Sequence, residues 1–375
     1  MNRPSPVLLI TTAVLVGLFL SACGGNPGED AHGEAPTAQA AGMGQLTIVD
    51  AKGRTLEFAE PPQRIVVAGK SSLTIVNTLF LFPEARDRVV GLVVGRQNPG
   101  DFLGLVDPAF DQKAVLAVES GPEQIAPLEP DVVILRSFMA ETLGKPLEQL
   151  DIPVVYVDLE TPEQYFRDVA TLGQVLGNGT RAEEIRAFYQ EKLDHVAKNL
   201  GSLADGQRPG VLLLQYSDKG GEVALNVPSA AWIQTTEAEL AGGQPLWKEA
   251  AQGGGWTVVN LEQIAAWDPD KVFIIHYNGN SAETADRIQT DSQWQALAAA
   301  QEAEIYGFAS DIYSWDQPDP RWILGVMWLA GKIHPESFED LDIEQEASQF
   351  FEQMYGLDSS TVEGEVLPTL KGDIQ

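Results

Sequence analysis

The segment Pro122-Glu-Gln-Ile-Ala-Pro-Leu-Glu-Pro-Asp-Val-Val-Ile134 returns later in the chain as Leu261-Glu-Gln-Ile-Ala-Ala-Trp-Asp-Pro-Asp-Lys-Val-Phe-Ile-Ile275. Aligning Gln124 with Gln263 places a Glu-Gln-Ile-Ala run, a Pro-Asp pair, a Val and an Ile in register. In both copies the Pro-Asp pair precedes an apolar run, which is typical of a buried strand in a parallel sheet. The repeat therefore predicts two related lobes.

The stretch between the two copies predicts two consecutive helices. Thr161-Pro162-Glu163-Gln164 has the order of a capping box with Pro at the first helical position. Gly177-Asn178-Gly179 breaks this helix, and Thr180-Arg181-Ala182-Glu183 offers a second capping box for a helix that runs to about Leu203. We expect an N-terminal lobe over residues 46–179, a connecting helix over 180–204 and a C-terminal lobe over 205–375. Since one continuous helix resists bending, only a small closure of the lobes on binding is expected.

Apolar runs alternate with helical patterns in both lobes, which favours a parallel or mostly parallel α/β structure. The first lobe begins with a predicted hairpin over Leu46–Phe58. Its further predicted strands are Arg64–Gly69, Arg88–Val94, Val132–Leu135 and Val154–Val157, with a helix over Ser71–Leu81. The second lobe has predicted strands at Pro209–Tyr216, Lys271–Tyr277 and Ala303–Phe308, and predicted helices at Ala230–Ala241, Pro320–Ile333 and Ile343–Tyr355. The fold class predicted is α/β: two Rossmann-like lobes with a ligand cleft between them.

The N-terminus has the pattern of a secretory signal over residues 1–22: one cation, Arg3, then an apolar run from Val7 to Leu20 that is short for a membrane span. The run ends in Leu20-Ser21-Ala22-Cys23, which resembles the lipobox of bacterial lipoproteins. That resemblance implies a lipidated Cys23 as the mature N-terminus. Residues 23–45 are rich in Gly, Ala and Pro and read as a tether.

Composition narrows the functional classes. With 24 Lys and Arg against 54 Asp and Glu, the net charge of −30 argues against nucleic acid as a partner. Cys23 is the only cysteine, so no internal disulfide or cysteine metal site is expected. No nucleophile elbow, P-loop, His-Glu-x-x-His helix or dinucleotide fingerprint occurs, so catalytic residues are not predicted and no cofactor is expected.

Three short patterns in the N-terminal lobe carry a family resemblance. These are Asp50-x-x-Gly53-Arg54 before Pro-Pro-x-Arg-Ile-Val, then Asp87-Arg-Val-Val-Gly, then the first copy of the repeat. Their order and spacing resemble the substrate-binding proteins of ABC importers for iron–siderophore, haem and cobalamin. The likeness extends over about Leu46 to Tyr355. It implies a small-molecule metal chelate as ligand and an ABC permease with its ATPase as partner.

Candidate ligand-binding residues follow from the position of the strands. In open α/β sheets ligands bind beyond the carboxyl ends of the strands. Aromatic and basic side chains gather in those loops and suit a bulky, planar or anionic ligand. The predicted set is Lys70, Ser71, Arg96, Arg136 (with Phe138 beside it), Tyr216, Trp232, Trp256, His276, Tyr277, Tyr313, Trp315 and Arg321.

The loop from Asp311 to Arg321 has two open interpretations. Asp319 can cap a helix that has Pro320 at its first position, which places Arg321 in the first turn, where a cation opposes the helix dipole. Arg321 then either binds an anionic group of the ligand or forms a structural bridge to Asp316 or Asp311.

A site built by the protein for a free metal ion is not expected. The four histidines form no His-x-His or His-x-x-x-His pair, so a metal is expected to arrive already chelated. If the chelate is haem, His276, Tyr277 or Tyr313 are the candidate axial ligands.

Two acidic residues are candidates for permease docking, on the strength of the resemblance alone. The family places one exposed acid on each lobe against basic residues of the permease, and Glu141 and Glu262 stand at the matching positions.

The function predicted is that of a lipid-anchored, monomeric solute-binding protein outside the cytoplasmic membrane. It would capture an iron chelate of siderophore type, with cobalamin or haem as alternatives, and deliver it to a permease. Two other classes stay open: an envelope enzyme on the same scaffold, and a sensor or scaffold lipoprotein.

Overall fold

Five parallel strands form the sheet of the N-terminal lobe. The computed structural model describes residues 46–94, 99–201 and 207–374, without the side chains of residues 99–101. The strand order is β5-β4-β3-β6-β7. The strands are β3 (Ile65–Val67), β4 (Val89–Val93), β5 (Ala114–Leu116), β6 (Val132–Arg136) and β7 (Val154–Val157). A hairpin of β1 (Leu46–Val49) and β2 (Thr55–Phe58) precedes them, and the helices are α1 (Leu73–Leu79), α2 (Ala85–Arg88), α3 (Pro99–Val106), α4 (Pro122–Ile125), α5 (Lys145–Glu148) and α6 (Pro162–Val175).

A mixed sheet forms the C-terminal lobe. Its main order is β11-β9-β8-β12-β13, with β10 pairing with β8 beside this path. Strands β8, β10, β12 and β13 pair in parallel, whereas β9 pairs antiparallel with both of its neighbours, β8 and β11. The strands are β8 (Gly210–Ser217), β9 (Ala224–Val227), β10 (Gln244–Pro245), β11 (Thr257–Val259), β12 (Lys271–Ile275) and β13 (Ile305–Gly307). The helices are α8 (Ile233–Leu240), α9 (Leu261–Trp267), α10 (Ser281–Thr290), α11 (Ala298–Gln301), α12 (Trp322–Ile333), α13 (Ile343–Tyr355) and α14 (Ser359–Thr361). The predicted α/β class with mostly parallel sheets is confirmed.

The sequence repeat corresponds to a structural repeat. Strands β6 and β12 each pair with the central strand of their sheet, β3 and β8. Before each strand an aspartate binds the start of that central strand: Asp131 Oδ2 accepts from the backbone N–H of Arg64, and Asp270 Oδ2 from that of Gly210. The Pro-Asp pair of the repeat therefore sets the register of two sheets.

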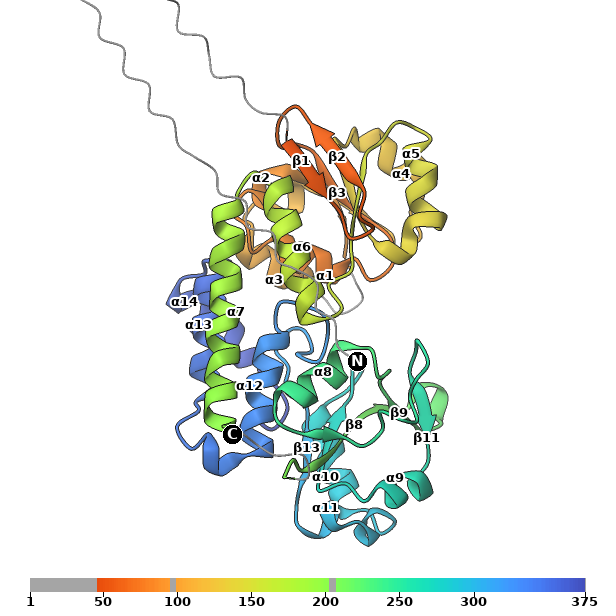
Figure 1. Ribbon diagram of the computed structural model, residues 1–375, viewed down its shortest axis with the longest axis vertical. Helices are drawn as coiled ribbons and strands as arrows, with labels where there is room; N and C mark the ends of the chain where they lie inside the picture. Colours follow the sequence, from red (N-terminus) through yellow and green to blue (C-terminus); the bar gives the residue numbers. More distant parts are fainter. Residues whose placement is uncertain (1–45, 95–98, 202–206, 375) are drawn as a thin grey trace, which may run out of the picture. The chain divides into compact units, whose positions relative to one another are not determined.

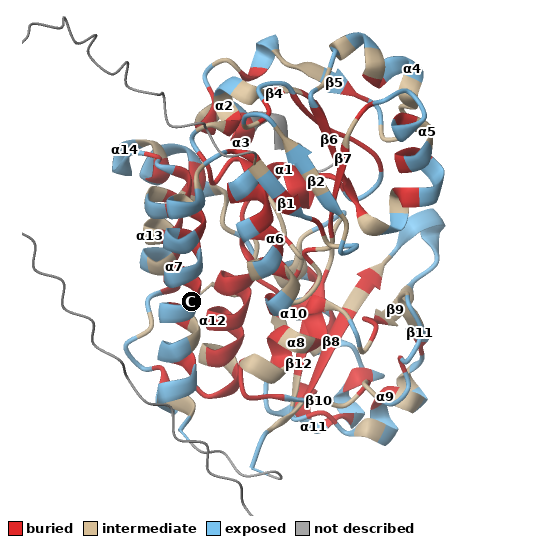
Figure 2. Ribbon diagram, turned by 45° about the horizontal axis from the view of Figure 1, so that its top comes forward, coloured by how far each residue is buried: buried red, intermediate tan, exposed pale blue. Residues whose placement is uncertain are grey.

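The connecting helix is α7 (Gly179–Leu200), whose 22 residues span about 33 Å. It contacts α6 and also α8 and α12, so it lies along both lobes (Figure 1). The expected cap at Thr180 is wrong, because the capping residue is Asn178, two residues earlier: its side chain accepts a hydrogen bond from the backbone N–H of Arg181 at 2.9 Å. Exposed residues lie along one side of α7 (Figure 2).

The C-terminal segment returns to the N-terminal lobe. The hydroxyl of Tyr355, at the end of α13, donates to the backbone carbonyl of Asn77 in α1. Arg181 of α7 donates to the backbone carbonyls of Gln353 and Met354. α12 is buried along almost its whole length (Figure 2). The two lobes are thus joined by packed helices as well as by α7.

Three further helix starts differ from the expectation, and one of them is that of α8, which begins at Ile233 instead of Ala230. α1 begins at Leu73 instead of Ser71, because Ser71 has a φ of 55°, outside the helical region. α12 begins at Trp322 instead of Pro320, with Arg321 in the cap position. Among the described residues, no helix is both long and apolar enough to cross a membrane.

Candidate ligand-binding site

A cavity of about 400 Å³ lies between the two lobes. Its size falls within the range of small-molecule pockets. The N-terminal lobe lines it with Ser71, Leu73, Thr74, Arg136, Phe138 and Glu160, and the C-terminal lobe with Trp232, Gln234, Gly254, Trp256, Tyr277, Tyr313, Gln317 and Pro318.

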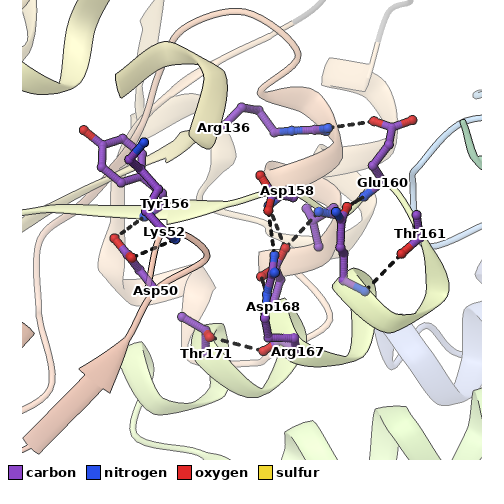
Figure 3. Close-up of polar contacts among 12 residues, drawn as sticks. Asp50, Lys52, Arg136, Tyr156, Asp158, Glu160, Thr161, Arg167, Asp168 and Thr171 are labelled. Carbon is purple, nitrogen blue, oxygen red and sulfur yellow. Dashed lines mark hydrogen bonds and ion pairs between the residues drawn. The ribbon is translucent and has the colours of Figure 1, made fainter. Parts of the chain in front are cut away.

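Arg136, the last residue of β6, supplies the positive charge of the cavity. Its side chain is buried, and its Nη1 donates to Thr74 Oγ1 at 3.1 Å. Its Nη2 donates to Glu160 Oε2 at 2.8 Å (Figure 3). The nearby Ser71 adopts a left-handed conformation, a strained backbone state of the kind that concentrates at functional sites.

Glu160 follows β7 and reaches into the cleft. Burial raises the pKa of its carboxyl, and the charge of Arg136 acts in the opposite direction. The backbone N–H of Ile233, the first residue of α8 in the other lobe, also acts on this carboxyl and lowers its pKa. Glu160 therefore interacts with both lobes across the cavity.

The C-terminal lobe contributes an aromatic wall. Trp232 packs edge-on against Trp256 with ring centroids 5.4 Å apart, and Trp256 packs against Tyr277 at 6.2 Å. Tyr313 completes this side of the cavity. Such rings offer rigid contact area to an organic ligand.

A buried acidic cluster stands behind the aromatic wall. The hydroxyl of Tyr277 donates to Asp316 Oδ2, and Gln234 Nε2 donates to the same oxygen at 3.2 Å. Burial raises the pKa of Asp316 and raises that of the neighbouring Glu237 well above its usual value. In the described part of the chain no group of three or more His, Cys, Asp or Glu side chains is arranged to hold a metal ion.

The structure brings together half of the predicted ligand-binding residues. These line the interlobe cavity: Ser71, Arg136, Trp232, Trp256, Tyr277 and Tyr313. Arg96 lies outside the described residues.

Three other predicted residues lie beside the cavity and do not line it. Lys70 borders a separate hollow on the N-terminal lobe. His276 Nδ1 bonds with the hydroxyl of Thr284 in α10 at 2.9 Å, and the His276 ring packs against that of Tyr216. The guanidinium of Arg287 covers the Tyr216 ring, 5.1 Å from its centroid.

The prediction that Arg321 and Trp315 bind the ligand is wrong. Arg321 is fully buried and forms ion pairs with Asp311 and Asp319, both at 2.9 Å. The indole of Trp315, also fully buried, donates to Asp311. Asp319 in turn accepts a hydrogen bond from Asn77 of the N-terminal lobe, so this loop fastens the lobes together. Of the two open interpretations, the structural bridge to Asp311 is the one observed.

The candidate axial ligands of haem are placed differently. Tyr277 and Tyr313 line the cavity, with the Tyr277 hydroxyl bonded to Asp316, whereas His276 lines a neighbouring hollow.

Several lining residues escaped the sequence analysis, namely Leu73, Thr74, Glu160, Gln234, Gly254, Gln317 and Pro318. A usable signal existed for Glu160, because it follows the predicted strand Val154–Val157, just as Arg136 ends the preceding strand. Thr74 and Gln234 lie in helices, and no sequence signal sets them apart from core residues.

The two docking candidates are exposed on separate lobes. Glu141 lies in a turn of π-helix (Ala140–Gly144), its side chain is 71% exposed, and it pairs with Lys145. Glu262 is exposed in the first turn of α9.

Two α/β lobes joined by a rigid helix, with an aromatic and charged cavity between them, define a protein that binds a small molecule. Residues 109–312, more than half of the chain, match the periplasmic binding protein family. The chain therefore belongs to that family and is a solute-binding protein of an ABC importer that functions outside the cytoplasm. Proteins of this family bind solutes for delivery to a permease and are not enzymes.

Similar proteins come from several bacteria. The molybdate-binding protein MolA of Haemophilus influenzae is 22% identical over 333 residues, which cover 82% of this chain and 90% of MolA. The structure of MolA bound to molybdate superimposes with a TM-score of 0.66 and 18% identity, covering 83% of this chain and 98% of MolA. A periplasmic solute-binding protein from Veillonella parvula gives a TM-score of 0.68 with 22% identity over 86% of this chain and 97% of that one. Helicobacter pylori CeuE, described in a complex with Ni-His, gives a TM-score of 0.65 with 18% identity, covering 86% of this chain and 99% of CeuE.

Proposed function

We propose that this binding protein captures an anionic metal chelate, of the ferric siderophore type, in the interlobe cavity. The observation that carries the proposal is the pairing of a buried arginine on one wall with an aromatic surface on the other. Arg136 provides a charge-assisted donor for a carboxylate, catecholate or hydroxamate oxygen. Trp232, Trp256 and Tyr313 provide the contact surface for the organic part of the chelate.

The metal itself is proposed to reach the protein inside its chelator. No described cluster of acidic, histidine or cysteine side chains offers three ligands, and the only carboxylate that lines the cavity, Glu160, is paired with Arg136. A hard cation such as Fe³⁺ needs several oxygen donors, which the chelator supplies.

A bare oxyanion of the molybdate type is the second candidate. It is favoured by the likeness to MolA, a molybdate-binding protein, and by the donors of Arg136 and the hydroxyls of Ser71 and Thr74 in one part of the cavity. An oxyanion would use the polar wall and leave the aromatic wall without a role.

A fluorescence titration separates the two candidates. Ferric tris(2,3-dihydroxybenzoate) is expected to quench the emission of Trp232 and Trp256, and Trp256→Ala is expected to weaken that binding several-fold, by about 0.5–1.5 kcal/mol. Molybdate binding should not depend on Trp256. Saturable binding of molybdate with no response to the ferric chelate would reject the chelate and favour the oxyanion.

We also propose that Glu141 and Glu262 dock on basic residues of the permease. Both carboxylates are exposed, and the pair of Glu141 with Lys145 at the surface contributes little to stability. The double charge reversal Glu141→Lys, Glu262→Lys should abolish uptake into cells and leave solute affinity unchanged. The matched control is Glu163→Lys with Glu302→Lys, which reverses two other exposed charges, one on each lobe. Equal uptake by both double variants would reject the docking assignment.

The anchor at Cys23 completes the proposal, although this residue lies outside the described part of the chain. Cys23→Ser is expected to move the protein from the membrane fraction to the soluble fraction. A wild-type N-terminal peptide without an added lipid mass would contradict the anchor.

A further inference from the structure

The carboxylate of Glu160 is paired with the arginine on which the proposed anionic ligand depends. Its Oε2 lies 2.8 Å from Arg136 Nη2, so the one cation among the described residues that line the cavity is engaged by a group of the same chain. The backbone N–H of Ile233 at the start of α8 also favours the charged form of this carboxyl. One carboxylate therefore interacts with both lobes, as a ligand's carboxylate or oxyanion would.

The loop that carries Glu160 is fixed from behind (Figure 3). Asp168, fully buried in α6, accepts the backbone N–H groups of Asp158 and Leu159 at 2.6 and 2.8 Å. Leu159 adopts a φ of 57°, a left-handed state that is strained for a leucine. Arg167 closes the loop by pairing with both Asp158 and Asp168. This support directs the next residue, Glu160, toward Arg136.

Two buried polar atoms beside Glu160 have no hydrogen-bond partner among the described residues. They are Nε of Arg136, a residue 5% exposed, and Oε1 of Gln234, a residue 3% exposed. Both side chains line the cavity. Buried polar groups are normally satisfied, so the donor on Arg136 and the acceptor on Gln234 are available to water or to a polar ligand.

From this arrangement we propose that Glu160 is an internal competitor that holds the anion position until it is displaced by the anionic group of the solute. The inference rests on the proposed function, since it concerns the same cavity and an anionic solute. Two negative groups cannot share Arg136 without repulsion in this partly buried place. Binding of the solute therefore requires that Glu160 leave, and its departure also ends its interaction with the N–H of Ile233.

This competition lowers the affinity for the solute and links it to the contact between the lobes. The binding-competent state is the fraction of molecules in which Glu160 has turned away, and the apparent affinity falls with that fraction. A molecule in which Glu160 has returned to Arg136 has no place for the solute's anion, which favours release.

The test compares Glu160→Gln with Glu163→Gln, which removes an exposed charge three residues away that does not line the cavity. Isothermal titration uses molybdate and ferric tris(2,3-dihydroxybenzoate) as probes. For whichever probe the wild type binds, Glu160→Gln should have an affinity about tenfold higher than the wild type. Glu163→Gln should have the same affinity as the wild type. An unchanged or weaker affinity of Glu160→Gln would overturn the inference.

A second measurement needs no knowledge of the solute. In Glu160→Ala the backbone N–H of Ile233 should exchange with deuterium at least about tenfold faster than in the wild type, and added acetate should restore its protection. Glu163→Ala should show neither effect. If acetate leaves the exchange of the Glu160→Ala protein unchanged, the anion position does not exist and the inference fails. If acetate protects while neither probe binds any variant, the inference is supported and the proposed ligand class is rejected.

Discussion

The two lobes are built from one repeated pattern, yet they give the cavity opposite chemistry. In the alignment that pairs Gln124 with Gln263, Glu129 pairs with Asp268, and both residues have a left-handed backbone with φ of 47° and 48°. Strand β6 then coincides with β12. Beyond the strands, the first lobe adds Arg136 and Glu160, whereas the second adds Trp256 and Tyr277.

The comparison shows which positions the scaffold determines and which are free to vary. Phe138 and Tyr277 are equivalent in the repeat, and both line the cavity. Arg136 is equivalent to Ile275, which is buried in the core of the C-terminal lobe. The repeat thus brings equivalent strand ends to the cleft. The N-terminal lobe provides charged side chains there, and the C-terminal lobe provides aromatic contact area.

The largest expected effect is a loss of stability, from a substitution in the loop that fastens the two lobes together. Arg321→Ala would leave Asp311 and Asp319 buried without their cation, which typically costs about 3–5 kcal/mol. Urea denaturation measures the free energy of unfolding. A loss below about 1 kcal/mol, together with weaker probe binding, would return Arg321 to the ligand site and contradict its structural assignment.

A pH effect is expected next, from the cluster behind the aromatic wall. Burial raises the pKa of Glu237 well above 4.5, and neither of its carboxylate oxygens has a partner among the described residues. The folded-state pKa of Glu237 exceeds the unfolded value, so the protonated carboxyl favours the folded protein. This contribution to stability is complete below pH 4.5 and is lost as the pH rises through the raised pKa. Denaturation curves across this range should show that Glu237→Gln loses less stability than the wild type at rising pH. Parallel pH profiles of the two proteins would contradict the expectation.

The polar wall is tested by Arg136→Gln. Loss of a charge-assisted hydrogen bond of about 1.5–3 kcal/mol predicts about 10- to 100-fold weaker binding of either probe. Arg287→Gln is the control, because Arg287 covers the ring of Tyr216 and does not line the cavity. Equal affinities of the two variants would show that the anion is bound elsewhere.

The smallest effect tests the repeat itself. Asp131→Ala and Asp270→Ala each remove a carboxylate that binds the start of a central strand, and each should cost about 1 kcal/mol of stability. The loss at Asp131 should be somewhat larger, since its carboxylate also accepts the backbone N–H of Gln63. A loss in only one lobe would show that the likeness of the two positions does not extend to their energetics.

Much of the fold could be predicted from the sequence, because buried parallel strands read as apolar runs. The strand Val154–Val157 and the helix Ile343–Tyr355 have the bounds expected from their patterns. The helix break at Gly177-Asn178-Gly179 was also evident, although the cap turned out to be Asn178.

The site was predicted only in part, for reasons that lie in strand geometry and distant contacts. That ligands bind beyond the carboxyl ends of strands identifies the edge of the sheet but not which side chains face the ligand. Successive side chains point to opposite sides, so Tyr277 lines the cavity while His276 turns to Thr284. Arg321 could not be assigned from its neighbours in sequence. The groups that surround it include Phe102, whose ring centroid lies 4.5 Å from the guanidinium carbon, far away in the chain.

The central claim is that one cavity, charged on one side and aromatic on the other, binds the solute. A crystal structure of the protein with ferric tris(2,3-dihydroxybenzoate), recorded at an iron anomalous wavelength, tests it most directly. The account predicts iron between Arg136 and Trp256, Glu160 turned away from Arg136, and a rotation of the lobes below about 20° relative to the empty protein. Iron bound outside this cavity, for example beside His276 or Lys70, or a chelate seated with the Glu160–Arg136 pair intact, would contradict it.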